Sequence, residues 1–170
     1  MKNPKHILVT GGEGYIGSSV CNFLLSKKKK IVSIDNLSNS RQRNFKKEIK
    51  FYKMDLKDKD KLENLFKLYN FETIIHLAAK IDARLSDIKK SEYYANNFIY
   101  GRNLVNIAKK YQAKYLLFAS SAAVYGSYKN KFKENDIKKP INSYGKYKLL
   151  LENFLLKSNL IHANLRFFNI

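Results

Sequence analysis

A glycine-rich loop between an apolar run and a helical pattern constrains the fold of this chain more than any other feature. The run "HILVT" at residues 6–10 leads into "GGEGYIGS" at residues 11–18, which fits the pattern G-x-G-x-x-G. Between a strand and a helix, the first glycines of this pattern permit a tight turn, and the last permits close packing of helix on strand. The middle glycine lets an anion such as a pyrophosphate lie on the backbone at the helix N-terminus.

Short apolar runs alternate with helical patterns along the chain. Runs rich in β-branched or aromatic residues, nearly continuous in apolar character, lie at residues 6–10, 31–35, 49–54, 72–79, 115–121 and 161–168. Apolar residues recur at helical spacing over residues 15–27, 57–69, 91–111 and 143–158. The alternation predicts a parallel sheet covered by helices on both faces. The expected fold is one α/β domain over residues 1–170, a Rossmann-type doubly wound sheet with three layers, α/β/α.

Composition excludes several classes of protein. The 170 residues suffice for one domain with a core, and no apolar run is long enough to span a membrane. The first expected strand begins at residue 6, which leaves no room for a signal peptide, and the single cysteine, Cys21, excludes an internal disulfide. We therefore expect a cytoplasmic protein in which Cys21 is a buried small residue.

The formal charge of +19 admits two interpretations. Nucleic-acid-binding proteins are often this basic, but they usually concentrate arginine and aromatic residues on one face. Here the lysines are spread along the chain, and "KKKK" at residues 27–30 falls where a solvated turn between helix and strand is expected. We expect no specific nucleic-acid partner, and a basic surface also attracts anionic nucleotides.

Asp35 favours a dinucleotide as the anion on the glycine loop. It ends the second expected strand, 18 residues after Gly17. A carboxylate there can accept hydrogen bonds from a ribose diol and would repel a 2′-phosphate, so NAD is favoured over NADP. The alternative is a purely structural glycine turn, and both the acid and the βαβ context count against it.

Two Tyr-x-x-x-Lys patterns offer the base that oxidation of an alcohol by NAD requires. A lysine one helical turn after a tyrosine can lower the pKa of the phenol. Tyr125 and Lys129 lie in an expected loop, whereas Tyr144 and Lys148 can share one face of a helix that Ser143 could cap. Chance accounts for about two such patterns in so Tyr- and Lys-rich a chain, so the residues alone leave open whether Tyr144 and Lys148 form a site.

The spacing Gly11-x-x-Gly14-x-x-Gly17, with "DNLSNS" at residues 35–40, resembles the extended short-chain dehydrogenase/reductase family, and most of all its UDP-glucose 4-epimerase branch. "FASSAAVYG" at residues 118–126 and "SYGKYK" at residues 143–148 resemble the serine and tyrosine segments of that family. The resemblance implies catalytic roles for three residues: Tyr144 as the base, Lys148 as the cation and nicotinamide-ribose ligand, and Ser121 as the partner of the sugar O4. Ser120 is the neighbour most easily confused with Ser121, and a serine at a strand end can also be only a satisfied polar terminus.

The resemblance also implies which residues hold NAD. Residues 54–56 ("MDL") would flank adenine, residues 76–79 ("HLAA") would line the cofactor, and Asn97 in "YYANN" would help to organise the site. The implied cofactor-binding residues are Gly11, Gly14, Tyr15, Ile16, Gly17, Asp35, Asn36, Asn39, Ser40, Asp55, Leu56, Leu77, Ala78, Ala79, Asn97, Tyr144 and Lys148. The implied substrate-binding residues are Ser121 and Asn169, and the three histidines His6, His76 and His162 are interpreted as core or strand-end residues, with no metal site.

Ala122 and Ala123 narrow the reaction that the resemblance implies. Dehydratases and decarboxylases of the family place an acidic residue just after the serine or threonine, because they perform further acid–base chemistry once a 4-keto sugar has formed. An alanine cannot move a proton. The implied reaction is therefore epimerisation at C4 of a UDP-hexose, UDP-glucose or UDP-galactose, through a transient 4-keto sugar with NAD regenerated in each cycle.

The chain departs from the family in length and at single positions. Family members are about twice as long, and this chain stops at "LRFFNI", where the half that binds the sugar nucleotide would begin. Phe167 stands where the epimerases usually have Tyr, and Ile81 where they often have a basic residue, with Lys80 next to it. We expect the NAD-binding half of an epimerase without its substrate domain; the alternatives are a non-catalytic NAD-binding module and a short homologue that borrows a partner. The family also implies a possible homodimer through helices 91–111 and 143–158.

Overall fold

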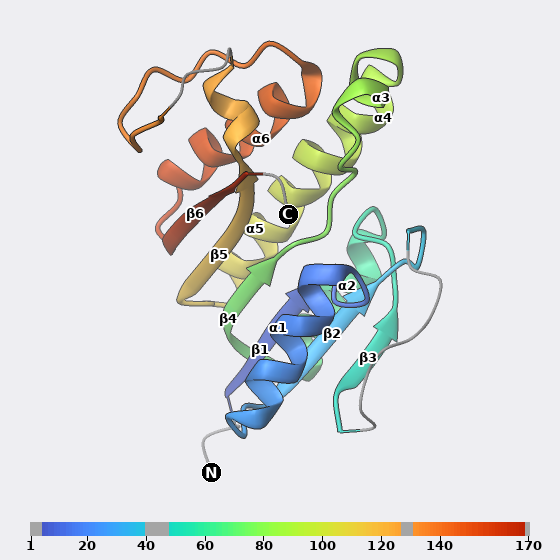
Figure 1. The fold of residues 1–170 in the computed structure, drawn as a ribbon. Coiled ribbons are helices and arrows are strands. Elements are labelled where there is room, and N and C mark those ends of the chain that lie inside the picture. Colours follow the sequence, from blue (N-terminus) through green and yellow to red (C-terminus); the bar gives the residue numbers. More distant parts are fainter. Residues whose placement is uncertain (1–4, 40–47, 127–130, 169–170) are drawn as a thin grey trace.

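Six parallel strands form the centre of the fold in the computed structural model, which describes residues 5–39, 48–126 and 131–168 (Figure 1). They are β1 (Lys5–Thr10), β2 (Ile31–Asp35), β3 (Lys50–Lys53), β4 (Asn70–His76), β5 (Tyr115–Ser121) and β6 (Ile161–Phe167). Their order in the sheet is β3-β2-β1-β4-β5-β6, and every neighbouring pair is parallel. The chain leaves β1 toward one edge and returns through β4 toward the other, so a crevice opens at the carboxyl ends of β1 and β4. The predicted Rossmann-type sheet is confirmed.

Helices cover both faces of the sheet. They are α1 (Tyr15–Ser26), α2 (Lys59–Leu68), α3 (Ala83–Ile88), α4 (Lys90–Tyr94), the π-helical η1 (Ala95–Tyr100), α5 (Gly101–Lys110), the 3-10 helix η2 (Ala122–Tyr125) and α6 (Ser143–Leu156). Successive residues of β1 point to opposite faces of the sheet. Leu8 packs in the core with α2, α5 and α6, whereas Val9 packs with Cys21 of α1 on the other face. Figure 1 shows α1 in front of the sheet and α5 and α6 behind it. The three-layer α/β/α arrangement is therefore confirmed, as is the burial of Cys21.

Gly11 and Gly17 are required by close contacts within the chain itself. Gly11 has a φ of 71°, in the left-handed region, and a Cβ there would lie 2.7 Å from the backbone nitrogen of Ala78. A Cβ on Gly17 would lie 2.0 Å from the carbonyl oxygen of Gly11. Because these neighbours are backbone atoms, only glycine lets β1, the loop and α1 approach so closely. The tight turn and the close helix packing that the glycines predicted are both present.

The helix expected over residues 91–111 contains a π-helical segment. The segments α4, η1 and α5 follow one another with helical dihedral angles at both junctions. Asn96 and Asn97 of η1 both accept a hydrogen bond from the backbone N–H of Lys80, at 3.1 and 2.8 Å. The wider π turn thus brings the side chains of Asn96 and Asn97 to the same Lys80 N–H group. The spacing of apolar residues along the sequence does not predict a π turn.

Other element boundaries also differ from the expectation. The helix α3 was not predicted, because six residues are too few for a helical repeat, although Asp82 caps it by accepting from the N–H groups of Arg84 and Leu85. The expected strand 72–79 ends at His76, which releases residues 77–79 into the crevice. Tyr125, expected in a loop, ends the helix η2, and Lys129 lies outside the described residues.

Two further observations bear on the surface of the protein. Lys27, Lys28, Lys29 and Lys30 are all exposed between α1 and β2, as the solvated turn predicted. No helix within the described ranges is long and apolar enough to cross a membrane.

Candidate cofactor and active site

A cleft of about 1700 Å³ runs across the carboxyl ends of the central strands. It collects most of the residues that the sequence nominated: Gly11, Gly14, Tyr15, Ile16, Gly17, Asp35, Asn36, Asn39, Asp55, Leu56, Leu77, Ala78, Ala79, Ser121, Tyr144 and Lys148. Asn97 is buried behind the cleft wall, and Ser40 and Asn169 lie outside the described residues. These residues come from the segments after β1, β2, β3 and β4, from the end of β5 and from α6, and they meet at the carboxyl edge of the parallel sheet.

Gly14 differs from Gly11 and Gly17 because a Cβ there would meet only one close neighbour. It is the N-cap residue of α1, and the nearest atom to a Cβ there would be the carbonyl oxygen of Gly11, at 3.3 Å. The first turn of α1 contains no acidic residue. A pyrophosphate can therefore approach the helix N-terminus, where unpaired N–H groups and the helix dipole favour an anion. The loop fits the phosphates of a dinucleotide.

Two backbone N–H groups, one of them in the glycine loop, hold the Asp35 carboxylate at the end of β2. Its Oδ2 accepts a hydrogen bond from the N–H of Glu13 at 3.0 Å, and its Oδ1 accepts from the N–H of Leu37 at 2.8 Å. Each carboxylate oxygen can accept a second bond, so both remain available to a ribose diol. The negative charge so close to the diol would repel a 2′-phosphate.

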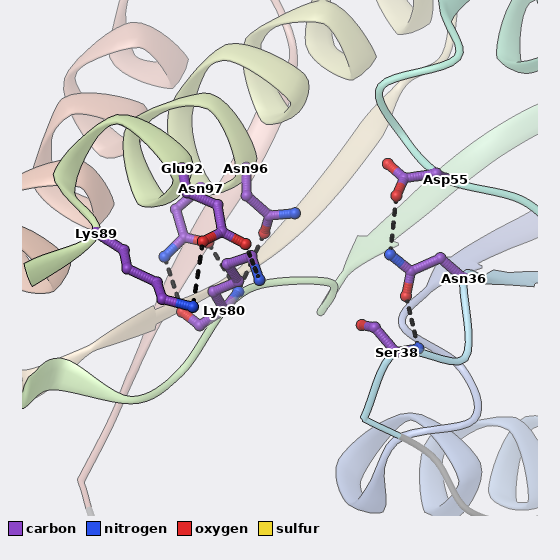
Figure 2. Close-up of polar contacts among 8 residues, drawn as sticks. All are labelled: Asn36, Ser38, Asp55, Lys80, Lys89, Glu92, Asn96 and Asn97. Carbon is purple, nitrogen blue, oxygen red and sulfur yellow. Dashed lines mark hydrogen bonds and ion pairs between the residues drawn. The ribbon is translucent and has the colours of Figure 1, made fainter. Parts of the chain in front are cut away.

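The loops after β2 and β3 are joined beside Asp35. Asn36 donates through Nδ2 to Asp55 at 2.9 Å and accepts through Oδ1 from the N–H of Ser38 at 3.0 Å (Figure 2). Asp55 also accepts from the N–H of Lys57 at 2.9 Å. Both Asn36 and Asp55 line the cleft. These bonds fix the wall against which the adenosine end of a dinucleotide would lie.

The loop after β4 is anchored to η1 on the other side of the cleft. Besides accepting from the Lys80 N–H, Asn97 donates to the Lys80 carbonyl oxygen at 2.8 Å. The Lys80 ammonium forms an ion pair with Glu92 at 2.7 Å, and Lys89 lies 4.0 Å from the same carboxylate (Figure 2). Asn97 thus holds the backbone of a cleft loop, and Lys80 is engaged by Glu92. Ile81, where the family often has a basic residue, is 69% exposed.

His76 fixes the start of that loop from inside the core. Its Nδ1 lies 2.8 Å from the hydroxyl of Thr10, which also accepts a bond from the N–H of Ala78 at 3.3 Å. Burial, followed by the nearby Lys148, lowers the pKa of His76 to about 3. The ring is therefore neutral near pH 7, and the interpretation of His76 as a buried strand-end residue is confirmed.

Tyr144 stands in the first turn of α6, and three polar groups orient that turn. Asn142, rather than Ser143, caps the helix, because its Oδ1 accepts from the N–H of Gly145 at 2.8 Å. The helix α3 supplies the other two acceptors: Ser86 Oγ accepts from the N–H of Tyr144, and Asp87 Oδ1 accepts from the N–H of Ser143, each at 2.9 Å. The prediction that Ser143 caps α6 is wrong, since its hydroxyl lies one residue too far into the helix.

The expectation that Lys148 lowers the pKa of Tyr144 is also wrong. The Lys148 ammonium lies 5.7 Å from the centre of the Tyr144 ring and donates a hydrogen bond to the Ala119 carbonyl oxygen at 2.7 Å. Burial therefore raises the pKa of Tyr144 above its ordinary value, and a hydrogen bond with the Ser121 side chain opposes the increase. The phenol is protonated at neutral pH.

Lys148 lines the cleft beside Tyr144 and also has a shifted pKa. It is 3% exposed, and burial lowers the pKa of its ammonium to about 7, while the Glu152 carboxylate opposes that shift. The ammonium also lies 4.9 Å from the centre of the Phe118 ring. A lysine that titrates near neutral pH can exchange a proton or donate hydrogen bonds within the range where enzymes work.

The structure separates the two serines at the end of β5. Ser121 forms the side-chain bond with Tyr144 and accepts from the N–H of Ala123 at 3.2 Å. Ser120 points to the opposite face of the sheet, where it is buried and donates to Glu152 at 2.5 Å. Ser121 is therefore the serine placed with Tyr144 and Lys148.

Aromatic side chains form the end of the cleft beyond Ser121. Phe132, Phe167 and Phe168 line it, and the Phe132 ring stacks on Tyr125 with ring centres 4.8 Å apart. Apart from Phe167, these positions were not nominated from the sequence. The approach of Phe132 to Tyr125 depends on a segment that returns over η2, and no local sequence pattern predicts such a contact.

Comparison with known proteins agrees with this geometry. The sequence matches the NAD dependent epimerase/dehydratase family over residues 7–170. It is 34% identical over 180 residues to a UDP-glucose 4-epimerase of Schizosaccharomyces pombe, covering 96% of this chain and 51% of the relative. The UDP-glucose 4-epimerase of Bacillus subtilis is 37% identical over 159 residues, which cover 88% of this chain and 46% of the relative.

Solved structures give the same result. The UDP-glucose 4-epimerase from Brucella ovis in complex with NAD superposes with a TM-score of 0.92 at 30% identity, covering 97% of this chain and 52% of that one. The UDP-Glc/GlcNAc 4-epimerase from Campylobacter jejuni superposes with a TM-score of 0.93 at 32% identity, covering 97% and 54%. The chain thus spans about half the length of the relatives it matches.

Proposed function

Because the chain belongs to the NAD-dependent epimerase/dehydratase family, we propose that it is the NAD-binding half of a UDP-hexose 4-epimerase. The observation that carries the proposal is the meeting of the glycine loop, Asp35 and the group Ser121, Tyr144 and Lys148 in one cleft. The glycine loop suits the pyrophosphate of NAD, and Asp35 suits its adenosine ribose. The hydroxyl groups of Ser121 and Tyr144 and the amine of Lys148 suit a sugar alcohol beside the nicotinamide.

NAD would be held by the residues that line the cleft. The N–H groups at the start of α1 would bind its pyrophosphate, Asp35 its adenosine ribose, and Lys148 its nicotinamide ribose. When bound, NAD supplies the hydride acceptor that oxidation of a sugar carbon requires, and the hydride donor for its re-reduction. Ala78 and Ala79, which are small and apolar, would keep water away from the nicotinamide.

Ser121 and Tyr144 would handle the proton of the sugar C4 hydroxyl. The bond between their side chains forms a short path along which that proton can leave as the C–H bond breaks. The reverse transfer would then return a proton to the oxygen when C4 is reduced on its other face.

Ala122 and Ala123 support epimerisation over dehydration. Both follow Ser121 directly and line the cleft, where neither can donate or accept a proton. The oxidised sugar would therefore meet no acid or base at this position that could eliminate water from it. UDP-glucose and UDP-galactose are the proposed substrates, and a cytoplasmic role in galactose metabolism belongs to the same proposal, as does a homodimer through α4–η1–α5 and α6.

A second candidate function is a non-catalytic NAD-binding module. Burial raises the pKa of Tyr144, which leaves the candidate base protonated at neutral pH, and this observation favours the module. Such a module would bind NAD and would respond to no UDP-sugar, whereas the NAD-binding half of an epimerase would gain activity when it is joined to a substrate-binding half.

The test joins residues 1–170 to the C-terminal half of the Bacillus subtilis epimerase and measures conversion of UDP-galactose to UDP-glucose with NAD. We expect conversion by the joined protein, a loss of at least about a hundredfold in Tyr144→Phe, and near-normal conversion in the control Tyr147→Phe on the same helix. A joined protein that binds NAD without converting the sugar would support the module instead. A Tyr144→Phe variant with an unchanged rate would refute the assignment of the base.

A further inference from the structure

The Glu152 carboxylate forms a buried junction between one helix and two strands. It is 2% exposed and accepts three hydrogen bonds: from Ser120 Oγ at 2.5 Å, from Arg166 Nε at 3.0 Å and from Arg166 Nη2 at 2.8 Å. Glu152 belongs to α6, Ser120 to β5 and Arg166 to β6. Ser120 and Arg166 are register partners, so their side chains leave the sheet on the same face, beneath α6.

Arg166 extends this junction toward the end of the cleft. Its Nη1 donates to the Tyr125 hydroxyl at 2.7 Å and to the Glu134 carbonyl oxygen at 2.8 Å, and its guanidinium lies 5.0 Å from the centre of the Tyr125 ring. One side chain therefore connects β6 to the end of η2 and to the segment that follows residues 127–130. The planar fork of arginine makes such multiple contacts possible, which a lysine could not reproduce.

Glu152 binds β5, the strand that also carries Ala119 and Ser121 of the site. Ser120 lies between Ala119, whose carbonyl oxygen accepts the Lys148 ammonium, and Ser121, whose hydroxyl meets Tyr144. Lys148 and Glu152 are one helical turn apart on α6, so both strand contacts come from the same helix face. The bonds Lys148–Ala119 and Glu152–Ser120 thus fix α6 and the end of β5 relative to each other at two consecutive residues.

Stability alone does not explain the ion pair between Glu152 and Arg166. Packed apolar side chains would hold α6 against the sheet at least as well, because burying two charges costs much of what their attraction returns. The pair does provide directional bonds, which fix the position of a strand more narrowly than apolar contact does.

We propose that Glu152 and Arg166 are positioning residues: through Ser120 they set the end of β5 so that Lys148 and Ser121 meet the nicotinamide ribose and the sugar hydroxyl. The proposal rests on the proposed function. It assigns no contact with cofactor or substrate to either residue. Its consequence is that breaking the junction weakens NAD binding in a protein that remains folded.

The first test compares the NAD affinity of the wild-type full chain with that of its variants by titration calorimetry. Ser120→Ala removes only the link to the strand, Glu152→Gln removes the buried charge, and Glu63→Gln, which breaks an ion pair with Lys110 distant from the cleft, is the matched control. We expect about a tenfold loss of NAD affinity in each of the first two variants and none in the control. The double variant should lose no more than the larger single loss, because both changes break one connection.

A second readout separates positioning from mere stability. With ¹³C-labelled lysine, the Lys148 Cε resonance, identified by its absence in Lys148→Met, reports the ammonium directly. The titratable side chains around it are Glu152 and Tyr144 on α6 and His76 on β4, and of these His76 stays neutral above about pH 5. Ser120→Ala leaves all of these groups in place, so a displaced Lys148 resonance in that variant would report a change of position.

The outcomes distinguish this proposal from the proposed function. Reduced NAD affinity and a displaced Lys148 resonance in folded Ser120→Ala support the proposal. Unchanged affinity and resonance, with only a lower melting temperature, would overturn it. Absence of NAD binding in the wild-type chain would count against the proposed function, and the resonance would then still decide whether the junction positions Lys148. Arg166→Lys should lose NAD affinity as Glu152→Gln does, and the control should not. Lysine keeps the positive charge but lacks the planar guanidinium that makes several hydrogen bonds at once.

Discussion

Replacing Lys148 by methionine should change how the stability of the protein depends on pH. Burial lowers the pKa of Lys148 from 10.5 to about 7. Between these values the folded chain carries a neutral amine and the unfolded chain a charged one, so folding releases a proton and the free energy of unfolding rises with pH. Below pH 7 both states are charged and the effect vanishes. From pH 7 to pH 9 the gain is about 2 kcal/mol for wild type, and Lys148→Met should lack it.

The assay is urea denaturation followed by circular dichroism at pH 7, 8 and 9. The upper limit is chosen because burial raises the pKa of the Cys21 thiol to about 11, so above pH 9 its ionisation in the unfolded chain lowers stability. That contribution is common to all the proteins compared. Lys146→Met, an exposed lysine on the same helix, is the control and should follow the wild-type curve.

A flat wild-type curve between pH 7 and pH 9, or equal slopes in wild type and Lys148→Met, would contradict the lowered pKa of Lys148. Either result would mean that Lys148 keeps its charge when the protein folds. It would then act as a permanent cation beside Tyr144 and not as a group that titrates near neutral pH.

Two further predictions follow from the loop and from the start of α6. Gly14→Ala should leave stability within about 1 kcal/mol of wild type and weaken NAD binding at least tenfold, because its Cβ would occupy the phosphate position. Gly17→Ala should destabilise the fold itself, since its Cβ would meet the Gly11 carbonyl oxygen, and equal melting temperatures for the two variants would contradict this difference. Ser86→Ala should cost about 1 kcal/mol and speed amide hydrogen exchange at Tyr144; unchanged exchange there would show that another group satisfies that N–H.

Features that depend on neighbouring residues could be predicted from the sequence. The glycine loop, the acid that ends β2 and the helix carrying Tyr144 and Lys148 each occupy one short segment, and each lies where the sequence placed it. The alternation of strands and helices was sufficient for the fold, because a parallel sheet with short connections leaves few topologies to choose from.

Features that depend on tertiary contact were missed. The junction at Glu152 joins residues from three elements, and only the register of β5 on β6 brings Ser120 opposite Arg166. The direction of the Tyr144 pKa shift was misjudged for a related reason. The sequence spacing correctly places Lys148 one helical turn from Tyr144. The Lys148 ammonium, however, donates its hydrogen bond to the Ala119 carbonyl oxygen, and burial is the largest influence on the pKa of the Tyr144 phenol.

Calorimetric titration of the purified chain with NAD and with NADP tests whether the glycine loop and Asp35 bind a dinucleotide. We predict saturable binding of one NAD per chain, NADP binding at least about tenfold weaker, and a smaller difference between the two in Asp35→Asn, because the repelling carboxylate is then gone. A chain that is folded by circular dichroism and binds neither dinucleotide, or binds both equally, would contradict this prediction.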